Sequence, residues 1–165
     1  MIVRLENFGT VLTSRPMDIK YRQFKNSDSE TVAELILNLY REDPSDKPMT
    51  PEKIQRTFDS LTHHPDRGNI IVLKQQDEIV GYSILSNFWS NEFGGNLLVI
   101  DELYVRENFR GKGIGTNFIK YIIENKFNNA VALQLEATPD NVRARKLYES
   151  LGFKLHKNTM LDLVL

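Results

Sequence analysis

The sequence predicts an α/β fold in which helices pack against a mixed β-sheet, and three observations support this class. Residues 97–125 have the pattern of an apolar strand, a glycine-rich basic turn and an amphipathic helix. Residues 130–151 have the pattern of a buried strand followed by a helix with an apolar stripe. Along the whole chain, the predicted order is a strand, two helices, three strands, a helix, a strand, a helix and two strands, which is typical of layered α/β domains.

The composition is that of one ordinary globular domain, predicted at residues 17–165 after an N-terminal arm at residues 1–16. Of the 165 residues, 41% are hydrophobic and 26% are charged, and this length is enough to bury a core. The 21 basic and 22 acidic residues nearly balance, so neither nucleic acid nor a membrane is expected as a partner. The absence of cysteine excludes disulfides and thiolate metal sites, and no metal is expected. Without a membrane-spanning run or a signal-peptide core, a cytoplasmic location is expected.

A strand and two helices are predicted after the arm. Alternation of apolar and polar residues predicts a strand at residues 18–24. Ser27 followed by Glu30 has the pattern of a capping box, which predicts a helix that ends near Tyr40. The dipeptide Thr50-Pro51 predicts the start of a second helix, because threonine is a good N-cap and proline is favoured at the first helical position.

Three strands are predicted in the middle of the chain. Residues 69–73 and 78–85 read as the two strands of an antiparallel hairpin. Residues 88–95 follow as an aromatic and acidic loop, whose aromatic side chains are either loop anchors or ligand contacts. The next strand, residues 97–105, is the fourth of the chain and is predicted to be central.

The turn after the fourth strand has the features of an anion-binding site. Its sequence is Arg110-Gly111-Lys112-Gly113-Ile114-Gly115. Glycine allows positive φ and a close approach of the backbone to a ligand, and the unpaired N–H groups at a helix start carry partial positive charge. Arg110 and Lys112 add two full charges, so a diphosphate is the ligand that suits this turn best. From these residues alone, an ordinary glycine-rich turn with solvated cations is the alternative.

The last third of the chain is predicted to contain two helices and three strands. The helix after the turn has an apolar face made of Ile114, Phe118, Ile119, Ile122 and Ile123. Residues 130–137 read as a buried strand. Residues 138–141 cap a short helix with an apolar stripe that includes Tyr148, and Gly152 ends this helix. Residues 153–156 and 160–165 are predicted as a final pair of strands.

Two motifs in the right order resemble the GNAT family of N-acetyltransferases. The first is Arg-x-x-Gly-x-Gly at residues 110–115, which follows the strand end Leu103-Tyr104-Val105 and resembles the family's coenzyme A signature. The second is Asn141-x-x-Ala144-x-x-x-Tyr148-x-x-x-Gly152-Phe153, which is similar to the family's final helix and following strand. The resemblance implies a mixed, mostly antiparallel sheet of six or seven strands, with helices on both faces and a splay between the fourth and fifth strands.

The same resemblance implies an enzyme with acetyl-CoA as its co-substrate and no metal. In the family, the diphosphate lies on the turn, the pantetheine arm pairs with the fourth strand, and an asparagine at the start of the last helix contacts pantetheine. The implied cofactor-binding residues are Leu103, Tyr104, Val105, Arg110, Gly111, Lys112, Gly113, Ile114, Gly115, Thr116 and Asn141. Tyr148 is the implied catalytic acid beside the thioester sulfur, although a core tyrosine gives the same helical pattern.

Two adjacent carboxylates, Asp101 and Glu102, interrupt the apolar fourth strand. Carboxylates in such a strand are costly unless they are paired or serve a function. Glu102 is the first candidate for the catalytic base and Asp101 the second, and both reach one cleft only if the strand has a bulge. A structural ion pair with a lysine or an arginine is the alternative. The pair resembles that of the spermidine/spermine acetyltransferases, with the order of the acids reversed.

The leading hypothesis is an N-acetyltransferase that moves the acetyl group of acetyl-CoA to a primary amine by direct attack in a ternary complex. The expected acceptor is a small cationic amine such as a polyamine, with Asp101, Glu92 and Trp89 as substrate-binding residues. Alternatives are an aminoglycoside-type enzyme, a protein lysine or N-terminal acetyltransferase, and a non-catalytic acyl-CoA-binding sensor. A homodimer is a family expectation.

Overall fold

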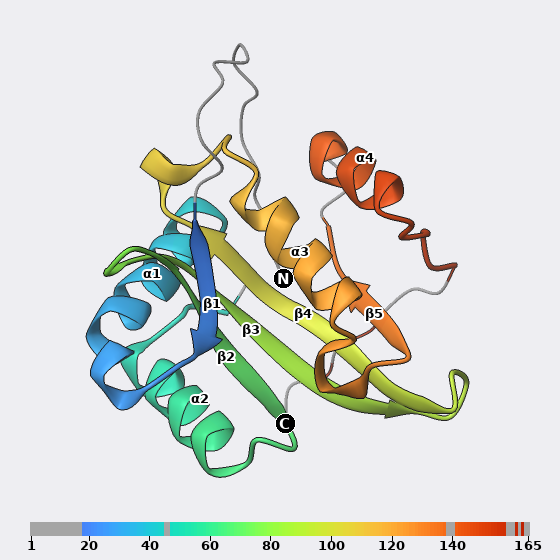
Figure 1. The fold of residues 1–165 in the computed structure, drawn as a ribbon. Helices are drawn as coiled ribbons and strands as arrows, with labels where there is room; N and C mark the ends of the chain where they lie inside the picture. The colour runs from blue at the N-terminus through green and yellow to red at the C-terminus, as the bar shows by residue number, and fades with distance from the viewer. Residues whose placement is uncertain (1–17, 45–46, 138–140, 158–160, 162, 164–165) are drawn as a thin grey trace.

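The computed structural model describes residues 18–44, 47–137, 141–157, 161 and 163, and these residues form a five-stranded sheet flanked by helices. The strands lie in the order β1-β2-β3-β4-β5 (Figure 1). Neighbours are antiparallel, except that β4 and β5 are parallel. The strands are Ile19–Gln23 (β1), Gly68–Gln75 (β2), Glu78–Ser90 (β3), Gly95–Val105 (β4) and Ala132–Leu135 (β5). The α-helices are Ser29–Glu42 (α1), Pro51–His63 (α2), Ile114–Glu124 (α3) and Val142–Ser150 (α4).

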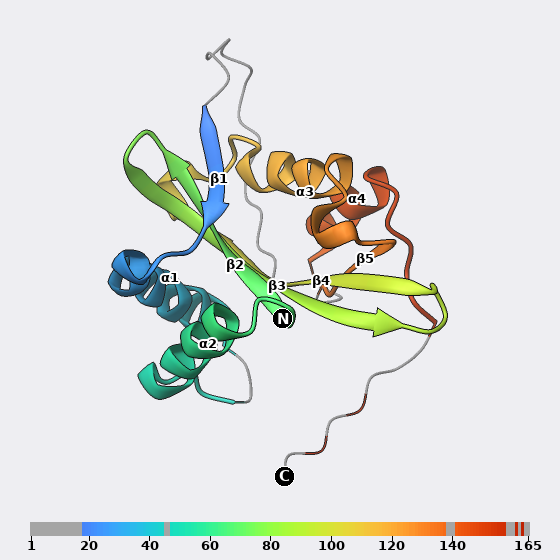
Figure 2. The ribbon, with the colours of Figure 1, turned by 60° about the horizontal axis from the view of Figure 1, so that its bottom comes forward.

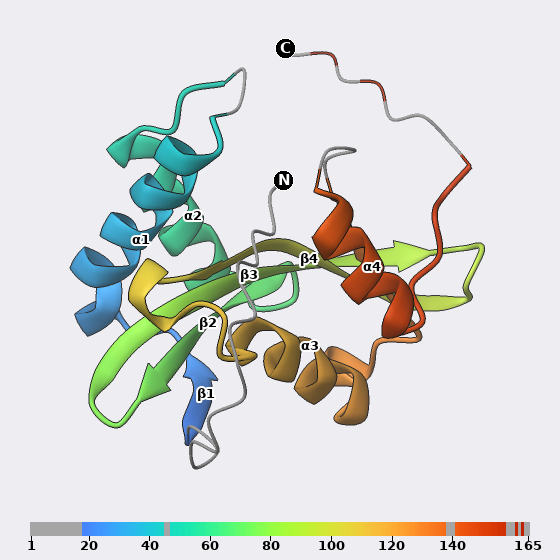
Figure 3. The ribbon, with the colours of Figure 1, turned by 90° about the horizontal axis from the view of Figure 1, so that it is seen from above.

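The helices cover both faces of the sheet, as predicted. Helices α1 and α2 lie together on one face and α3 lies on the other (Figures 2 and 3). On the first face, Val32, Leu35 and Phe58 pack on the sheet in one buried cluster. On the second face, α3 and α4 share a separate buried cluster with the sheet. The chain therefore builds two cores, one on each side of a central sheet, and the predicted α/β class is confirmed.

Strand β2 shows why the middle of the chain is so apolar. Successive side chains of a strand point to opposite faces of the sheet. Ile70 and Val72 therefore face α1 and α2, whereas Ile71 and Leu73 face α3. A strand covered on both faces needs apolar residues at every position, which accounts for the continuous run at residues 70–73.

A β-bulge at Asp101 divides β4 into two parts that face different ways. Ile84 of β3 lies opposite Glu102, but Leu85 lies opposite Ile100, so Asp101 is an extra residue in β4. Before the bulge, the even-numbered Ile100 packs toward α3, and after the bulge the odd-numbered Leu103 does so. The inserted residue thus moves Glu102 to the face that carries α1 and α2.

The helix boundaries contain two corrections and one confirmed cap. No capping box forms at Ser27, because Asp28 caps a short 3₁₀ turn there and accepts a hydrogen bond from the Lys25 backbone N–H at 2.8 Å. Helix α1 continues to Glu42, two residues beyond the predicted end. Thr50 caps α2 as predicted, since its side chain accepts a hydrogen bond from the Lys53 N–H.

Several strand predictions need correction. Strand β3 runs to Ser90, so residues 88–90 are strand and the predicted aromatic loop is reduced to a short turn. Strand β5 has four residues instead of eight, and Val131 is exposed. Residues 153–156 are irregular, which leaves five strands in the described part of the chain instead of six or seven. Most of residues 160–165, together with the arm at residues 1–16, lie outside the described residues.

The described ranges lack two kinds of feature. None of the helices there is both long enough and apolar enough to cross a membrane. The same ranges contain no group of three or more histidine, aspartate or glutamate side chains that could hold a metal ion.

Candidate active site

The glycine-rich turn at the start of α3 has the backbone geometry of an anion-binding site. Gly111 and Gly113 have φ angles of 73° and 77°, a left-handed conformation that favours glycine. The first hydrogen bond of α3 runs from the Asn117 N–H to the Gly113 carbonyl at 2.8 Å. The N–H groups of residues 114–116 therefore precede the helical hydrogen-bond ladder and point along the positive end of the helix dipole. These are the backbone groups on which the phosphate prediction depends.

The two cations of this turn are engaged by the protein. The Arg110 guanidinium is 2.7 Å from a carboxylate oxygen of Glu42, at the end of α1, and its Nε donates to the Val105 carbonyl at 2.8 Å. The Tyr104 hydroxyl donates to the same Glu42 carboxylate at 2.8 Å. The Lys112 ammonium donates to a backbone carbonyl at 2.9 Å. In this structure Arg110 ties the turn to α1, and its predicted contact with the phosphates stays a prediction.

Glu102 is the most deeply buried carboxylate of the candidate site. Only 6% of its surface is exposed. One carboxylate oxygen accepts a hydrogen bond from the Tyr40 hydroxyl at 2.9 Å, and the other accepts one from the Tyr82 hydroxyl at 2.7 Å. The side chain of Ser83 fixes the backbone here by donating to the Glu102 carbonyl at 2.7 Å. The hydrogen-bond partners of the Glu102 carboxylate are thus two phenols. The alternative drawn from the sequence was an ion pair with a lysine or an arginine.

The environment of Glu102 makes it a better proton acceptor than an ordinary glutamate. Burial raises the pKa of Glu102, and the charge of Asp101 raises it further, while the hydrogen bonds from Tyr40 and Tyr82 partly offset the increase. Asp101 itself is exposed. Desolvation by the protein atoms around Asp101 raises its pKa, and the negative charge of Glu136, which follows β5, raises it further.

A gap in the sheet opens beside these carboxylates. The pairing of β4 with β5 ends at Ile100 and Leu135, immediately before the bulge. Beyond that point, residues 101–105 of β4 are paired with β3 and have no pairing partner on the other side in the described part of the chain. This is the predicted splay between the fourth and fifth strands, and it leaves backbone groups of β4 available to an extended ligand.

Tyr148 lies in the core between α4 and the sheet. Asn141 begins α4, and its side chain accepts a hydrogen bond from the Ala144 N–H at 3.1 Å. Tyr148 is 3% exposed, yet no described residue makes a hydrogen bond with its hydroxyl. Burial also raises the pKa of Tyr148, so the hydroxyl keeps its proton at neutral pH. A buried, protonated hydroxyl that has no partner among the described residues is costly in a folded protein, and a hydrogen-bond acceptor supplied from outside these residues would remove that cost.

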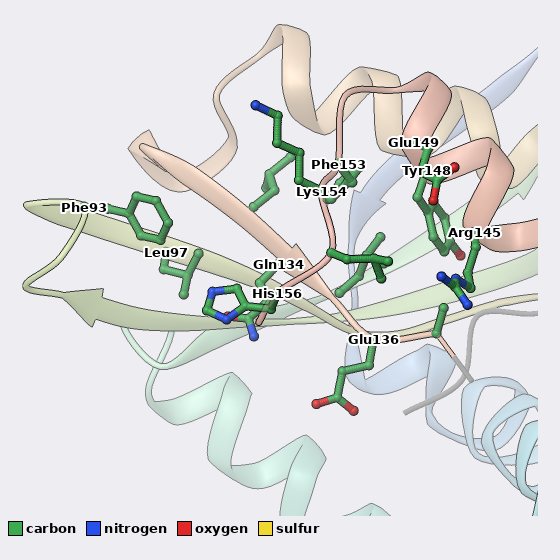
Figure 4. A pocket seen from close by; sticks show the side chains of 14 residues that line it. Phe93, Leu97, Gln134, Glu136, Arg145, Tyr148, Glu149, Phe153, Lys154 and His156 are labelled. Atoms are coloured by element: carbon green, nitrogen blue, oxygen red, sulfur yellow. The ribbon is translucent and has the colours of Figure 1, made fainter. Parts of the chain in front are cut away.

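Tyr148 also lines a cavity of about 590 Å³ along β5 and α4. Figure 4 shows Tyr148 and Arg145 at one end of this pocket and Phe93 at the other. Trp89 and Glu92 do not line it. Trp89 is 71% exposed and lies opposite Asn96, roughly 20 Å from Glu102 along β4 at ~3.4 Å per residue. The structure therefore does not bring these two predicted substrate-binding residues beside the carboxylates.

Sequence reasoning missed three residues of the site: Tyr40, Tyr82 and Glu136. Tyr40 continues the buried stripe of α1, because it follows Ile36 by one helical turn. This spacing was a usable signal for an inward-pointing tyrosine. The other two residues gave no local signal, since their roles depend on which strands and helices become neighbours.

Comparisons with known proteins bear on the family and the fold of this chain. The model of the Acetyltransferase (GNAT) family matches residues 32–153. An aminoglycoside N(6')-acetyltransferase type 1 from Klebsiella pneumoniae is 32% identical over 69 residues, which are 41% of this chain and 34% of that protein. A thialysine N-epsilon-acetyltransferase from Bos taurus is 33% identical over 75 residues, which are 45% of this chain and 44% of that protein. The chain thus spans less than half the length of either relative. The crystal structure of a possible acetyltransferase from Clostridium difficile 630 matches with a TM-score of 0.77 and 26% identity, over 89% of this chain and 97% of that chain.

Proposed function

The chain belongs to the GNAT family of acetyltransferases, and we propose that it transfers the acetyl group of acetyl-CoA to a primary amine of a small cationic acceptor. One observation carries this proposal: the buried carboxylate of Glu102 follows the point where the pairing of β4 with β5 ends, and a buried phenol without a partner among the described residues, Tyr148, lines the cavity along β5 on the other face of the sheet. The carboxylate of Glu102 is suited to take a proton, and the phenol of Tyr148 is suited to give one.

The fit of acetyl-CoA to this chain rests on three features. The N–H groups of residues 114–116 would bind the diphosphate, with Gly111 and Gly113 allowing the close approach. The backbone of residues 103–105, which β5 does not cover, would pair with the pantetheine arm. The unpartnered hydroxyl of Tyr148 would gain a partner at the thioester end. When bound, acetyl-CoA supplies an acetyl group activated as a thioester.

Glu102 would remove the proton that makes the acceptor unreactive. An alkyl ammonium with a pKa of about 10.4 is neutral in about one molecule in 2,500 at pH 7, which corresponds to about 4.6 kcal/mol. Burial raises the pKa of Glu102 toward that of the acceptor, which makes the transfer less unfavourable. Asp101 and Glu136 add negative charge at the opening, which favours a cationic acceptor.

Tyr148 would then supply a proton to the sulfur that leaves. Its hydroxyl is protonated at neutral pH, because burial raises its pKa. Helix α4 and the ring of Phe153, whose centroid is 5.9 Å from that of Tyr148, hold the phenol in place. The two proton-transfer groups thus stand on rigid elements instead of loops.

Calorimetry with acetyl-CoA tests the first half of the proposal. We expect the protein to bind acetyl-CoA, and Gly113→Val to weaken binding at least about tenfold, because valine strains a turn whose φ is 77°. Gly94→Val is the matched control. Gly94 also has a positive φ, 64°, with open space around it, but it lies in the β3–β4 hairpin turn. Equal affinity in both variants, or no binding by the unmodified protein, would contradict the proposal.

Release of free thiol from acetyl-CoA tests the second half. The amine panel contains spermidine as a polyamine, thialysine because of the Bos taurus relative, and kanamycin because a kanamycin resistance protein from Rhizobium radiobacter is 30% identical over 69 residues. We expect turnover with at least one of them, and no thiol release without an amine. Binding of acetyl-CoA without thiol release on any amine would favour the non-catalytic sensor.

Glu42 and Arg110 give a separate prediction about the cofactor turn. Because their ion pair is partly buried and joins the turn to α1, Glu42→Gln and Arg110→Gln are each expected to weaken acetyl-CoA binding about tenfold by loosening the turn. The double variant should bind no more weakly than either single variant, since both changes break one contact. Calorimetry on the four proteins measures this coupling. Tighter binding by Glu42→Gln would instead identify Arg110 as a direct phosphate ligand.

A further inference from the structure

Glu102 and its two hydrogen-bond partners, Tyr40 and Tyr82, form a cluster. The three members of this Glu102 cluster differ in their access to solvent. Glu102 is 6% exposed and Tyr82 is 0% exposed, so both are sealed inside the protein. Tyr40, near the end of α1, is only partly buried. Both carboxylate oxygens of Glu102 already accept a phenolic hydrogen bond. Of these three residues, Tyr40 is therefore the one most accessible to a proton that arrives from an acceptor.

We propose that Tyr40 relays the proton of the acceptor ammonium to Glu102. In this step the Tyr40 oxygen takes a proton from the ammonium, and the original O–H proton of Tyr40 moves to the Glu102 oxygen 2.9 Å away. The amine becomes neutral, Glu102 becomes a carboxylic acid, and Tyr40 is again a phenol, so charge and protons balance. The inference rests on the proposed function and adds a residue to its proton path.

The position of Tyr40 suits a relay on the acceptor side of the sheet. The proposed phosphate site lies at the start of α3, on one face of the sheet, whereas α1 and Glu102 lie on the other. A cofactor that enters from the α3 face leaves the α1 face to the acceptor. The hydroxyl of Tyr40 therefore stands between the acceptor side and the carboxylate.

Tyr82 has the complementary task of positioning. Its ring lies 6.2 Å from that of Tyr104, between centroids, and its hydroxyl holds the second oxygen of Glu102 at 2.7 Å. Being fully buried, Tyr82 cannot receive a proton from an acceptor directly. It can fix the carboxylate so that the other oxygen faces Tyr40.

The charges around the cluster favour a relay over a stable phenolate. Burial and the nearby Glu102 carboxylate both raise the pKa of Tyr40, so its hydroxyl gives up its own proton only as it gains another. Asp101 on β4 adds negative charge. Among the described residues, Glu42 and Arg110 beside Tyr104 neutralise each other in a direct ion pair at 2.7 Å, and the Tyr104 hydroxyl donates to the same Glu42 carboxylate.

The matched variants Tyr40→Phe and Tyr82→Phe test the relay, with spermidine, kanamycin and thialysine as acceptors. Each variant removes one hydrogen bond that stabilises the Glu102 carboxylate, so each raises the pKa of Glu102 and moves the acid limb of kcat/KM to higher pH. Only Tyr40→Phe removes the relay. Its kcat at the high-pH plateau should fall about 10²-fold, at least ten times more than that of Tyr82→Phe. Tyr21→Phe, a tyrosine packed against α3, serves as the unchanged control.

Two further measurements keep the outcomes distinct. Incorporation of 3,5-difluorotyrosine at position 40 keeps a hydroxyl there and should restore most of the plateau rate. Calorimetry with acetyl-CoA and thermal unfolding check that each variant is folded. Equal losses of kcat at the high-pH plateau in Tyr40→Phe and Tyr82→Phe would overturn the relay. Glu102→Gln, measured in parallel, shows separately whether Glu102 acts as the base. Full activity of Glu102→Gln, or no turnover of any amine, would overturn the proposed function and the relay with it.

Discussion

Glu102→Gln is expected to lower kcat by about 10²- to 10⁴-fold, the range that a positioned acid or base contributes, while acetyl-CoA affinity changes less than about threefold. Glutamine has nearly the same shape and keeps an oxygen for one phenol, but it cannot take a proton from the acceptor. Steady-state kinetics by thiol release, together with calorimetry, separate these two effects. Glu78→Gln, an exposed glutamate at the start of β3, is the matched control and should retain full activity.

The same substitution is expected to change the pH dependence of stability in a defined direction. The pKa of Glu102 is raised in the folded protein, so between the unfolded value of about 4.3 and the folded value the native state holds more protons. The stability of the unmodified protein therefore falls as the pH rises through this window. Glutamine does not titrate, so the stability of Glu102→Gln relative to the unmodified protein should increase over the same range. Denaturant unfolding at pH 4 and pH 8 measures this difference, and a decrease would show that the two phenols outweigh burial.

The local structure of the proposed cofactor site was the most predictable part, because its signals are local. Glycines at positions 111 and 113 are needed for positive φ within the turn itself. Asn141 caps α4 by binding an N–H only three residues away. Such features depend on neighbouring residues in the chain, so a single sequence was enough to identify them.

The acceptor side was predictable only in part, because its contacts are distant in sequence. Glu102 was identified as a costly buried acid, and the need for a bulge followed from strand geometry. Its partners Tyr40 and Tyr82, however, are 62 and 20 positions away. Which phenols reach the carboxylate depends on the register of β3 with β4 and on how α1 packs, and neither is encoded in a local pattern.

The wrong boundaries have the same physical origin. The predicted cap at Ser27 does not form, and Asp28 takes that position. Arg22 of β1 holds the Asp28 carboxylate at 2.7 Å, and the same carboxylate accepts a hydrogen bond from the Lys25 N–H. Helix α1 runs past its predicted end, and its last residue, Glu42, is held by Tyr104 and Arg110. In each case, a tertiary contact decided an end that local propensity left open.

Tyr148→Phe is expected to stabilise the protein without cofactor while lowering kcat by about 10²-fold or more. The phenylalanine ring keeps the packing against Phe153 and removes a buried hydroxyl that has no partner among the described residues. An unsatisfied buried polar group costs about 1–3 kcal/mol, so the free energy of unfolding should rise by about that amount. Denaturant unfolding and thiol-release kinetics on the same preparation measure the two effects.

The opposite signs of these two effects are what distinguish a catalytic tyrosine from a core tyrosine. A purely structural phenol would leave kcat nearly unchanged when its hydroxyl is removed, and a hydroxyl with a hidden partner would make Tyr148→Phe less stable. Tyr121→Phe is the control, because this half-buried tyrosine of α3 packs beside Tyr21 and should show neither effect. Saturating acetyl-CoA should reduce the stability advantage of Tyr148→Phe, since a bound thioester would give the hydroxyl of the unmodified protein the partner that it lacks.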